Sequence, residues 1–232
     1  MELHRGRPAA GTVGFSVTAL RIHPSAIIFD YGMVLCQPQP LADRQAMAAV
    51  LDMDQAAFDA TYWQFRLAFD EAILDTEAYW TQVAQRAVSP AEIEALNAID
   101  ARSWTHPDTL MIDWARRLRA AGMRTAILSN MPLPVREYLD GVDWLPEFDV
   151  RTFSCDIRLA KPGPEIYRHC LRDLGTAPSD ALFLDDRPEN VRGAEAVGIH
   201  SILYTSPTDL AQHLQLRFAT SSPLVATLKV GR

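Results

Sequence analysis

Four short stretches of this chain carry polar side chains of the kinds that do chemistry. They are Asp30 after the apolar run 26–29, Ser129 and Asn130 after 125–128, Lys161 ahead of a Pro-Gly pair, and Asp185 with Asp186 after 181–184. Each alone is weak evidence, because an Asp that follows a strand is most often a turn or capping residue. Together they supply three carboxylates, a hydroxyl, an amide and an ammonium group, which form a candidate site if the fold brings them to one place.

The segments around these residues predict a parallel α/β sheet. Short continuous apolar runs are typical of strands buried on both faces, and helical patterns separate them. Strands that alternate with helices of this length favour right-handed crossovers in a Rossmann-like, doubly wound sheet. Ligands bind at the carboxyl ends of the strands in such sheets, so the polar residues are expected at that edge. The expected strands are 26–29, 125–128, 181–184 and 202–204, and the expected helices are 110–121, 164–174 and 188–197.

Residues 38–106 form a different kind of segment, with helical patterns and no convincing strand. Asp54 and Ser89 stand at positions typical of N-caps. Aromatic residues are dense here, which is typical of a small helical core, although some of them could line a substrate pocket. The candidates for substrate contact are Trp63, Arg66, Asp70 and Trp80. The four expected helices span 41–51, 55–69, 76–87 and 90–103.

Composition excludes several classes of protein. With 29 acidic and 22 basic residues the net charge is -7, which argues against a nucleic-acid partner. No apolar run approaches the ~18 residues of a membrane span. Three cysteines without a C-x-x-C pair argue against a disulfide framework and fit a reducing, cytoplasmic compartment. The motifs of P-loop, dinucleotide-binding, serine-elbow and zinc-protease sites do not occur.

The order and content of the four polar motifs resemble the haloacid dehalogenase-like hydrolase superfamily, which consists mostly of phosphatases. The resemblance covers about residues 25–205, and the helical segment looks like the α-helical cap of that family's capped subfamily I. The pair Asp30 and Gly32 makes the chain most similar to the Asp-x-Gly branch, which includes phosphatases of glucose 1-phosphate. The resemblance implies a core at 25–37 and 107–205 with a cap at 38–106, and the sequence on either side is expected to form an extension at 1–24 and a helix and tail at 206–232.

The resemblance also implies roles for individual residues. Asp30 matches the nucleophile, whose carboxylate would attack phosphorus and form an aspartyl-phosphate. Ser129 matches the phosphate-binding hydroxyl, and the amide of Asn130 would stand beside it. Lys161 matches the cation that neutralises the phosphoryl oxygens and keeps Asp30 ionised.

The metal that the resemblance implies is Mg²⁺, which prefers oxygen ligands and retains some of its waters. Asp30 and Asp186 match ligands, Gly32 would contribute its main-chain carbonyl, and Asp185 would be either a ligand or a neighbour that supports one. Only Lys161 and Lys229 are lysines among the 22 basic residues. A compact ammonium can thread between two carboxylates where a planar guanidinium would not fit, which gives a reason for lysine at position 161.

Gly32 departs from the family pattern. Phosphatases of this superfamily usually carry a second Asp there, which protonates the leaving alcohol and then activates water. General acid–base help is worth ~10²–10⁴-fold in rate. Three explanations remain open: a good leaving group such as the anomeric oxygen of a sugar 1-phosphate, a water or an insert residue such as Asp70 or Glu71, or slow turnover in a protein that mainly binds.

The sequence therefore predicts a Mg²⁺-dependent phosphatase that hydrolyses a small phosphorylated metabolite. Sugar phosphates are among the candidate substrates. Two alternatives remain. A haloacid-type dehalogenase also uses an Asp nucleophile but no metal, and the adjacent Asp185 and Asp186 argue against it. The second alternative is a weakly catalytic or non-enzymatic protein, which is favoured by the lack of an acid/base side chain at Gly32. No membrane or nucleic-acid partner is expected, and the chain is expected to be a monomer or a homodimer.

Overall fold

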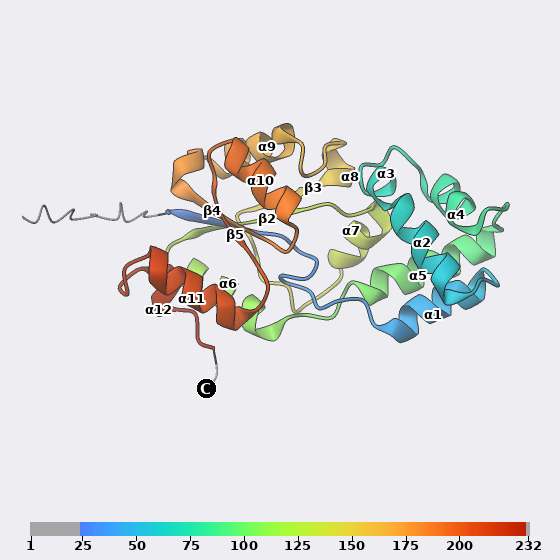
Figure 1. Ribbon diagram of the computed structural model, residues 1–232, viewed down its shortest axis with the longest axis horizontal. Coiled ribbons are helices and arrows are strands. Elements are labelled where there is room, and N and C mark those ends of the chain that lie inside the picture. Colours follow the sequence, from blue (N-terminus) through green and yellow to red (C-terminus); the bar gives the residue numbers. More distant parts are fainter. Residues whose placement is uncertain (1–23, 231–232) are drawn as a thin grey trace, which may run out of the picture.

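The computed structural model describes residues 24–230, so the extension expected at 1–24 lies almost entirely outside the described residues. Its centre is a five-stranded, all-parallel sheet in the order β3-β2-β1-β4-β5 (Figure 1). The doubly wound α/β fold class is thus confirmed. The strands are β1 (Ala26–Phe29), β2 (Arg124–Ser129), β3 (Val150–Phe153), β4 (Ala181–Asp185) and β5 (His200–Leu203).

Alternate residues of the central strand pack into two separate cores. Ile27 and Phe29 face one side, where Trp114 meets the Phe29 ring edge to face at 5.6 Å between ring centroids. Ala26 and Ile28 face the other side. The first face is covered by α6 (Thr109–Ala120) and α11 (Pro207–Arg217), and the second by α9 (Pro164–Leu174) and α10 (Pro188–Ala196), which lie on opposite sides of the sheet in Figure 1.

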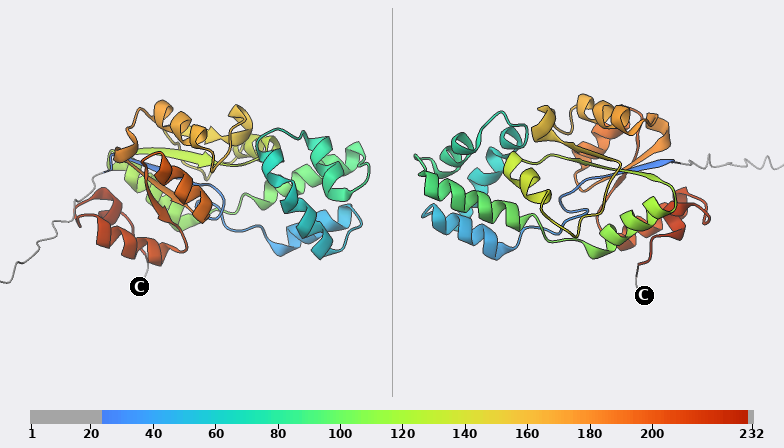
Figure 2. Two further views of the ribbon diagram at one scale, coloured as in Figure 1. Left: turned by 45° about the horizontal axis from the view of Figure 1, so that its top comes forward. Right: turned by 180° about the vertical axis from the view of Figure 1, so that it is seen from behind.

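Residues 38–106, called the helical insert from here on, contain helices and no strand, and the structure describes all of them. These helices lie beyond the carboxyl ends of the strands (Figures 1 and 2) and bury a third hydrophobic core of their own. Both expected caps are present: Asp54 accepts hydrogen bonds from two backbone N–H groups, and Ser89 forms a capping box with Glu92. The helices are α1 (Leu41–Val50), α2 (Gln55–Gln64), α3 (Arg66–Asp70), α4 (Thr76–Ala84) and α5 (Pro90–Ser103).

Two of the expected insert helices differ from the structure. The helix expected at 55–69 is two helices, α2 and α3, which meet at Phe65, where φ is -104° and ψ is 0°. The helix expected at 76–87 ends at Ala84, since Gln85 adopts the left-handed conformation with φ +54°.

The sequence interpretation did not predict strand β3 or four short helical elements. Strand β3 is short and lies at the edge, with Arg151 exposed, so it lacks the continuous apolar run that marks the inner strands. The other missed elements are α7 (Leu133–Leu139), α8 (Ser154–Ile157), a 3₁₀ turn (Pro178–Asp180) and α12 (Pro223–Ala226). No helix among residues 24–230 is long and apolar enough to cross a membrane.

Candidate active site

The predicted site residues meet at the carboxyl edge of the sheet. Asp30 follows β1, Ser129 ends β2 and Asp185 ends β4. Strands β1 and β4 are neighbours, and the backbone N–H of Asp30 extends their pairing by donating to Leu184 O at 2.8 Å. The chain leaves these two strands toward opposite sides of the sheet, which makes this the switch point where doubly wound sheets bind ligands.

Lys161 lies buried between two carboxylates. Its Nζ is 2.8 Å from Asp30 Oδ1 and 2.7 Å from Asp185 Oδ2, and only 2% of the residue is exposed. Burial disfavours the ammonium, but the two carboxylates outweigh it and hold the pKa of Lys161 above its usual value. The side chain therefore stays protonated, in the threaded arrangement that the sequence interpretation predicted.

Asn130 holds the backbone of Lys161 in place. Its Nδ2 donates to Lys161 O and its Oδ1 accepts from Lys161 N, each at 2.9 Å. Both ends of the amide are thus engaged with the main chain. The structure gives Asn130 a positioning contact to the lysine, and its expected contact with phosphate remains a prediction.

Asp185 is fully buried, and both of its carboxylate oxygens accept hydrogen bonds. Oδ1 accepts from Arg187 N at 2.8 Å and from Asn190 Nδ2 at 3.0 Å, and Oδ2 accepts from Lys161 Nζ and from the same amide at 3.1 Å. With both oxygens occupied, Asp185 is placed to support Lys161. Asp186 is half-buried and lines the cavity, so of the pair it would be the better placed to bind a metal ion.

The carboxylates of this site fit a divalent cation. Asp30, Asp185 and Asp186 each offer an oxygen within 4.8 Å of the others, and Lys161 balances one of the three charges. A doubly charged ion would balance the other two. Burial raises the pKa of Asp30 to about 7, opposed by Lys161 and reinforced by Asp185 and Asp186. Burial and Asp185 likewise raise the pKa of Asp186. Excess buried negative charge and hard oxygen donors are suited to Mg²⁺.

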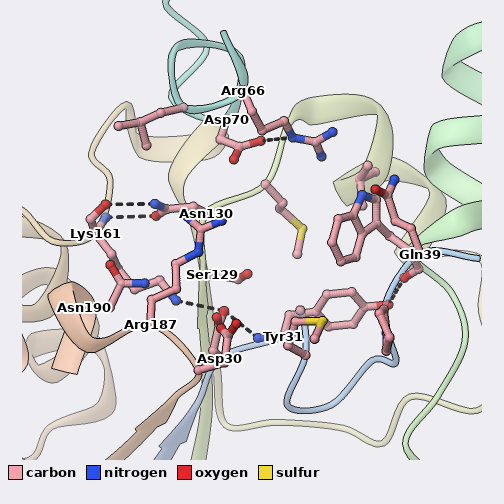
Figure 3. A pocket seen from close by; sticks show the side chains of 18 of the residues that line it. Asp30, Tyr31, Gln39, Arg66, Asp70, Ser129, Asn130, Lys161, Arg187 and Asn190 are labelled. Atoms are coloured by element: carbon pink, nitrogen blue, oxygen red, sulfur yellow. Dashed lines mark hydrogen bonds and ion pairs between the residues drawn. The ribbon is translucent and has the colours of Figure 1, made fainter. Parts of the chain in front are cut away.

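A cavity of about 550 Å³ opens above these residues and separates them from the helical insert. Ser129 and Asp30 lie at its floor, and Arg66 and Asp70 lie at the opposite wall (Figure 3). The core contributes these lining residues: Asp30, Tyr31, Gly32, Met33, Ser129, Asn130, Met131, Val135, Lys161, Asp186, Arg187 and Asn190. The insert and its two connections contribute Pro38, Gln39, Arg44, Trp63, Arg66, Leu67, Asp70 and Trp104.

The insert wall contains a buried polar network around Arg66. The guanidinium donates to Asp70 Oδ1 at 2.8 Å, lies 3.1 Å from Asp100 Oδ2 and contacts Tyr62 Oη. Gln39 donates from Nε2 to Tyr62 Oη at 3.0 Å and to Asp100 Oδ1 at 3.2 Å. Most of these contacts lie within the network, while Gln39 Oε1 and Asp70 Oδ2 have no hydrogen-bond partner among residues 24–230.

Three of the four substrate-contact candidates line the cavity, and one does not. Trp63, Arg66 and Asp70 are lining residues. Trp80 is wrong as a candidate: it is fully buried in the insert core, where its Nε1 donates to Asn97 Oδ1 at 2.8 Å. Gln39 and Trp104 also line the cavity and were not predicted, because nothing in the local sequence distinguishes a pocket-lining side chain from a core one.

The indole ring of Trp104 lies beside Gly32. A Cβ built on Gly32 would lie 3.4 Å from Trp104 Cζ3, so the indole occupies the space beside it. The indole Nε1 donates to Tyr62 Oη at 3.3 Å, and Tyr31 Oη donates to the main-chain carbonyl of Trp104 at 2.5 Å. A longer side chain at position 32 would meet this ring.

Fold and site together define an enzyme pocket at the carboxyl edge of a parallel sheet, beneath a helical insert. The sequence profile of the haloacid dehalogenase-like hydrolases matches residues 24–198, and the chain belongs to this family of hydrolases.

Similar proteins were found by sequence and by structure. The chain is 26% identical to sesquiterpene phosphatase astK of Aspergillus oryzae over 83% of this chain and 94% of that protein. It is 36% identical to mouse acyl-CoA dehydrogenase family member 10 over 43% of this chain but only 9% of the relative's length. A HAD family enzyme of Bacteroides thetaiotaomicron superposes with a TM-score of 0.68 at 17% identity, covering 83% of this chain and 98% of that one.

Proposed function

We propose that this protein is a Mg²⁺-dependent phosphomonoesterase that acts through an aspartyl-phosphate on Asp30. The observation that carries the proposal is the buried Lys161, bridged between Asp30 and Asp185 at the floor of a cavity. This arrangement orients the Asp30 carboxylate and places a cation beside it, which favours the ionised form that a carboxylate nucleophile requires. Hydrolases of one family act on different bonds, so the phosphatase assignment rests on the site.

Asp30 is positioned through one of its two oxygens. Oδ1 accepts from Tyr31 N at 2.7 Å and pairs with Lys161 Nζ, while Oδ2 has no hydrogen-bond partner among residues 24–230. Oδ2 is therefore the oxygen that would attack phosphorus. The bond from Oδ2 to phosphorus forms as the ester P–O bond breaks and the alcohol leaves; water then displaces Asp30 and releases inorganic phosphate.

Positive charge and donors for the phosphoryl oxygens come from the cavity floor. Lys161 and the buried hydroxyl of Ser129 are within the lining, and Arg187 is exposed at the rim. Bound Mg²⁺ would neutralise phosphoryl charge, with Asp30, Asp186 and the Gly32 carbonyl as its ligands. The net charge of -7 is compatible with an anionic substrate because the local field at the site differs from that of the whole chain.

Relatives support this reading. Sesquiterpene phosphatase astK, which the chain matches over nearly its full length, is a phosphatase by name. The Bacteroides HAD family enzyme was solved in complex with magnesium and inorganic phosphate.

The cavity favours a phosphate ester with an apolar alcohol over the sugar 1-phosphate that the Asp-x-Gly resemblance implies. Met33, Trp63 and Leu67 line the cavity while 43%, 42% and 49% of each residue is exposed. Exposed apolar side chains gathered at one opening mark a binding surface. The nearby Arg66 network is largely paired within itself, so sugar hydroxyls would compete there with contacts that are already made.

A haloacid-type dehalogenase is the second candidate, because its Asp nucleophile attacks carbon. Three clustered carboxylates with a single lysine disfavour it, since a metal-free site would keep the excess negative charge beside an anionic haloacid. Halide release from a 2-haloacid in the presence of EDTA would restore this candidate.

The experiment is a phosphate-release assay over aryl, isoprenyl and sugar monophosphates with Mg²⁺ or EDTA, using Asp30→Asn as the control. Activity that needs both Mg²⁺ and Asp30, and that is higher on apolar esters, supports the proposal. Activity that survives EDTA and Asp30→Asn contradicts it. Beryllofluoride with Mg²⁺ should raise the melting temperature of the wild type but not of Asp30→Asn, which tests the site independently of turnover.

Three buried free thiols, Cys36, Cys155 and Cys170, accord with the expected cytoplasmic location. A monomer or homodimer remains the expected state of assembly.

A further inference from the structure

Position 32, where phosphatases of this family usually carry an acidic residue, supplies no proton donor to the proposed reaction. Gly32 offers no side chain, and the Trp104 indole fills the adjacent space. Departure of an alkoxide without a proton is costly, and general acid catalysis is worth ~10²–10⁴-fold. A donor, if the chain supplies one, must therefore come from another part of the lining.

The geometry of phosphoryl transfer says where that donor has to be. The attacking and leaving oxygens lie roughly in line on opposite sides of phosphorus. With Asp30 at the cavity floor, the leaving oxygen points away from the sheet and toward the helical insert. In Figure 3 the wall opposite Asp30 is the one that carries Asp70.

Asp70 is the one carboxylate that the helical insert contributes to the lining. The other acidic lining residues are Asp30 and Asp186, both from the core. Its Oδ1 accepts from Arg66 Nε, and its Oδ2 has no hydrogen-bond partner among the described residues. The neighbouring Glu71, the other insert acid considered from the sequence, is not in the lining.

The buried Ser154 connects the backbone of Asp70 to the loop that follows β2. Ser154 Oγ donates to the Asp70 carbonyl at 2.5 Å and accepts from Met131 N at 3.0 Å. Met131 follows directly on Ser129 and Asn130, so the end of α3 is fixed relative to the strand that carries the phosphate-binding hydroxyl. Ser154 thus holds the backbone of Asp70 and Arg66 holds its carboxylate, so the side chain has a defined position beside the cavity.

The surroundings of Asp70 let its carboxyl group hold a proton to a higher pH than an ordinary aspartate does. Burial raises the pKa of Asp70 to about 6, although Arg66 opposes the rise. An acid with a pKa close to the working pH both donates and accepts protons efficiently. The titratable groups that face it are Arg66, Tyr79, Asp100, Cys155 and Arg187.

We infer that Asp70 is the general acid and base of this enzyme, replacing the acidic residue that position 32 lacks. The inference rests on the proposed phosphatase function. As the ester P–O bond breaks, the proton on Asp70 passes to the departing alcohol oxygen. The resulting carboxylate then takes a proton from the water that bonds to phosphorus, and cleavage of the Asp30–phosphorus bond restores both residues to their starting states.

The test compares substrates whose leaving groups differ in their need for a proton. An alkyl phosphate needs protonation of its poor leaving group, whereas 4-nitrophenyl phosphate leaves as a stable anion. In Asp70→Asn we expect kcat/KM to fall ~10²–10⁴-fold for the alkyl ester and much less for the nitrophenyl ester. Glu71→Gln is the matched control and should leave both values unchanged. The pH profile of the wild type should contain an ionisation near pH 6, and that of Asp70→Asn should lack it.

Several outcomes overturn the inference. An equal loss on both esters would mean that Asp70 only holds structure, and an unchanged kcat/KM would mean that it has no role. If Asp70→Asn does not fold, kcat/KM of the wild type is measured on a series of esters whose leaving groups differ in pKa. Proton donation predicts that kcat/KM depends only weakly on leaving-group pKa, and a steep dependence refutes the inference. Failure of the phosphatase proposal itself is distinguishable, because then wild-type activity on both esters would be absent or independent of Asp30.

Discussion

Gly193 sits where α10 touches the loop that carries Lys161, and adding one methyl group there should disable the site. A Cβ at Gly193 would lie 2.6 Å from Pro162 O, 3.0 Å from Tyr167 Oη and 3.1 Å from Pro162 Cβ. Restoring an ordinary contact of 3.4 Å to the carbonyl requires a shift of about 0.8 Å. Because Pro162 is bonded to Lys161, that shift moves the lysine out of its 2.7 and 2.8 Å contacts.

The cost can be worked from these distances. A misplacement of about 1 Å in catalytic groups lowers rates by ~10²-fold, so kcat of Gly193→Ala should fall by one to two orders of magnitude. Overpacking destabilises by about 1–3 kcal/mol, partly offset by the ~1 kcal/mol by which Ala exceeds Gly in helix propensity. The melting temperature should therefore change little compared with the activity.

Steady-state kinetics on 4-nitrophenyl phosphate and thermal unfolding measure the two effects. Gly141→Ala is the matched control, since its Cβ would meet only the Tyr138 carbonyl at 3.6 Å, an ordinary contact. If Gly193→Ala keeps kcat within twofold of the wild type, the contact between α10 and the loop does not position Lys161, and the reasoning is refuted.

Other variants test other parts of the site. Lys161→Met removes the cation between two buried carboxylates, so phosphatase activity should fall at least ~10³-fold; retention of a tenth of the activity in the same assay would contradict this role. Asp185→Asn leaves that buried lysine with one partner, which should lower the free energy of unfolding by about 3–5 kcal/mol in urea titration; an unchanged stability would show that the pair contributes little. The raised pKa of Asp70 means that the folded state binds its proton more tightly than the unfolded state, so this group favours folding below pH 4 and loses that effect as the pH rises through about 6. Asp70→Asn should therefore become more stable relative to the wild type between pH 4 and pH 7, by up to about 3 kcal/mol in denaturant titrations at each pH; parallel pH curves would show that the carboxyl is not perturbed.

The sheet could be predicted because its inner strands are apolar along their whole length. Residues such as Ile27 and Ile28 are buried on opposite faces, and a sequence records this as an unbroken run. The edge strand β3 is covered less completely and gives no such pattern. Parallel strands then bring Asp30, Ser129 and Asp185 to one edge by topology alone.

Which groups contact which could not be predicted in full. Asp185 and Asp186 are adjacent and of the same type, so the sequence does not distinguish them. In the structure, hydrogen bonds from Arg187 N and Asn190 Nδ2 hold Asp185 buried beside Lys161, whereas Asp186 faces the cavity. The position of Asp70 depends on a break in the helix at Phe65 and on a contact with Ser154, 84 residues away. Such long-range contacts have no local signature.

The aspartyl-phosphate on Asp30 is the central claim, and it can be trapped directly. The protein is mixed with excess substrate and Mg²⁺, quenched in acid within one turnover, digested and examined by mass spectrometry. A phosphoryl group should be found on the peptide that contains Asp30, and it should be missing in Asp30→Asn and in EDTA. Rapid release of phosphate with no modified peptide at any quench time, together with an active Asp30→Asn variant, would contradict the account.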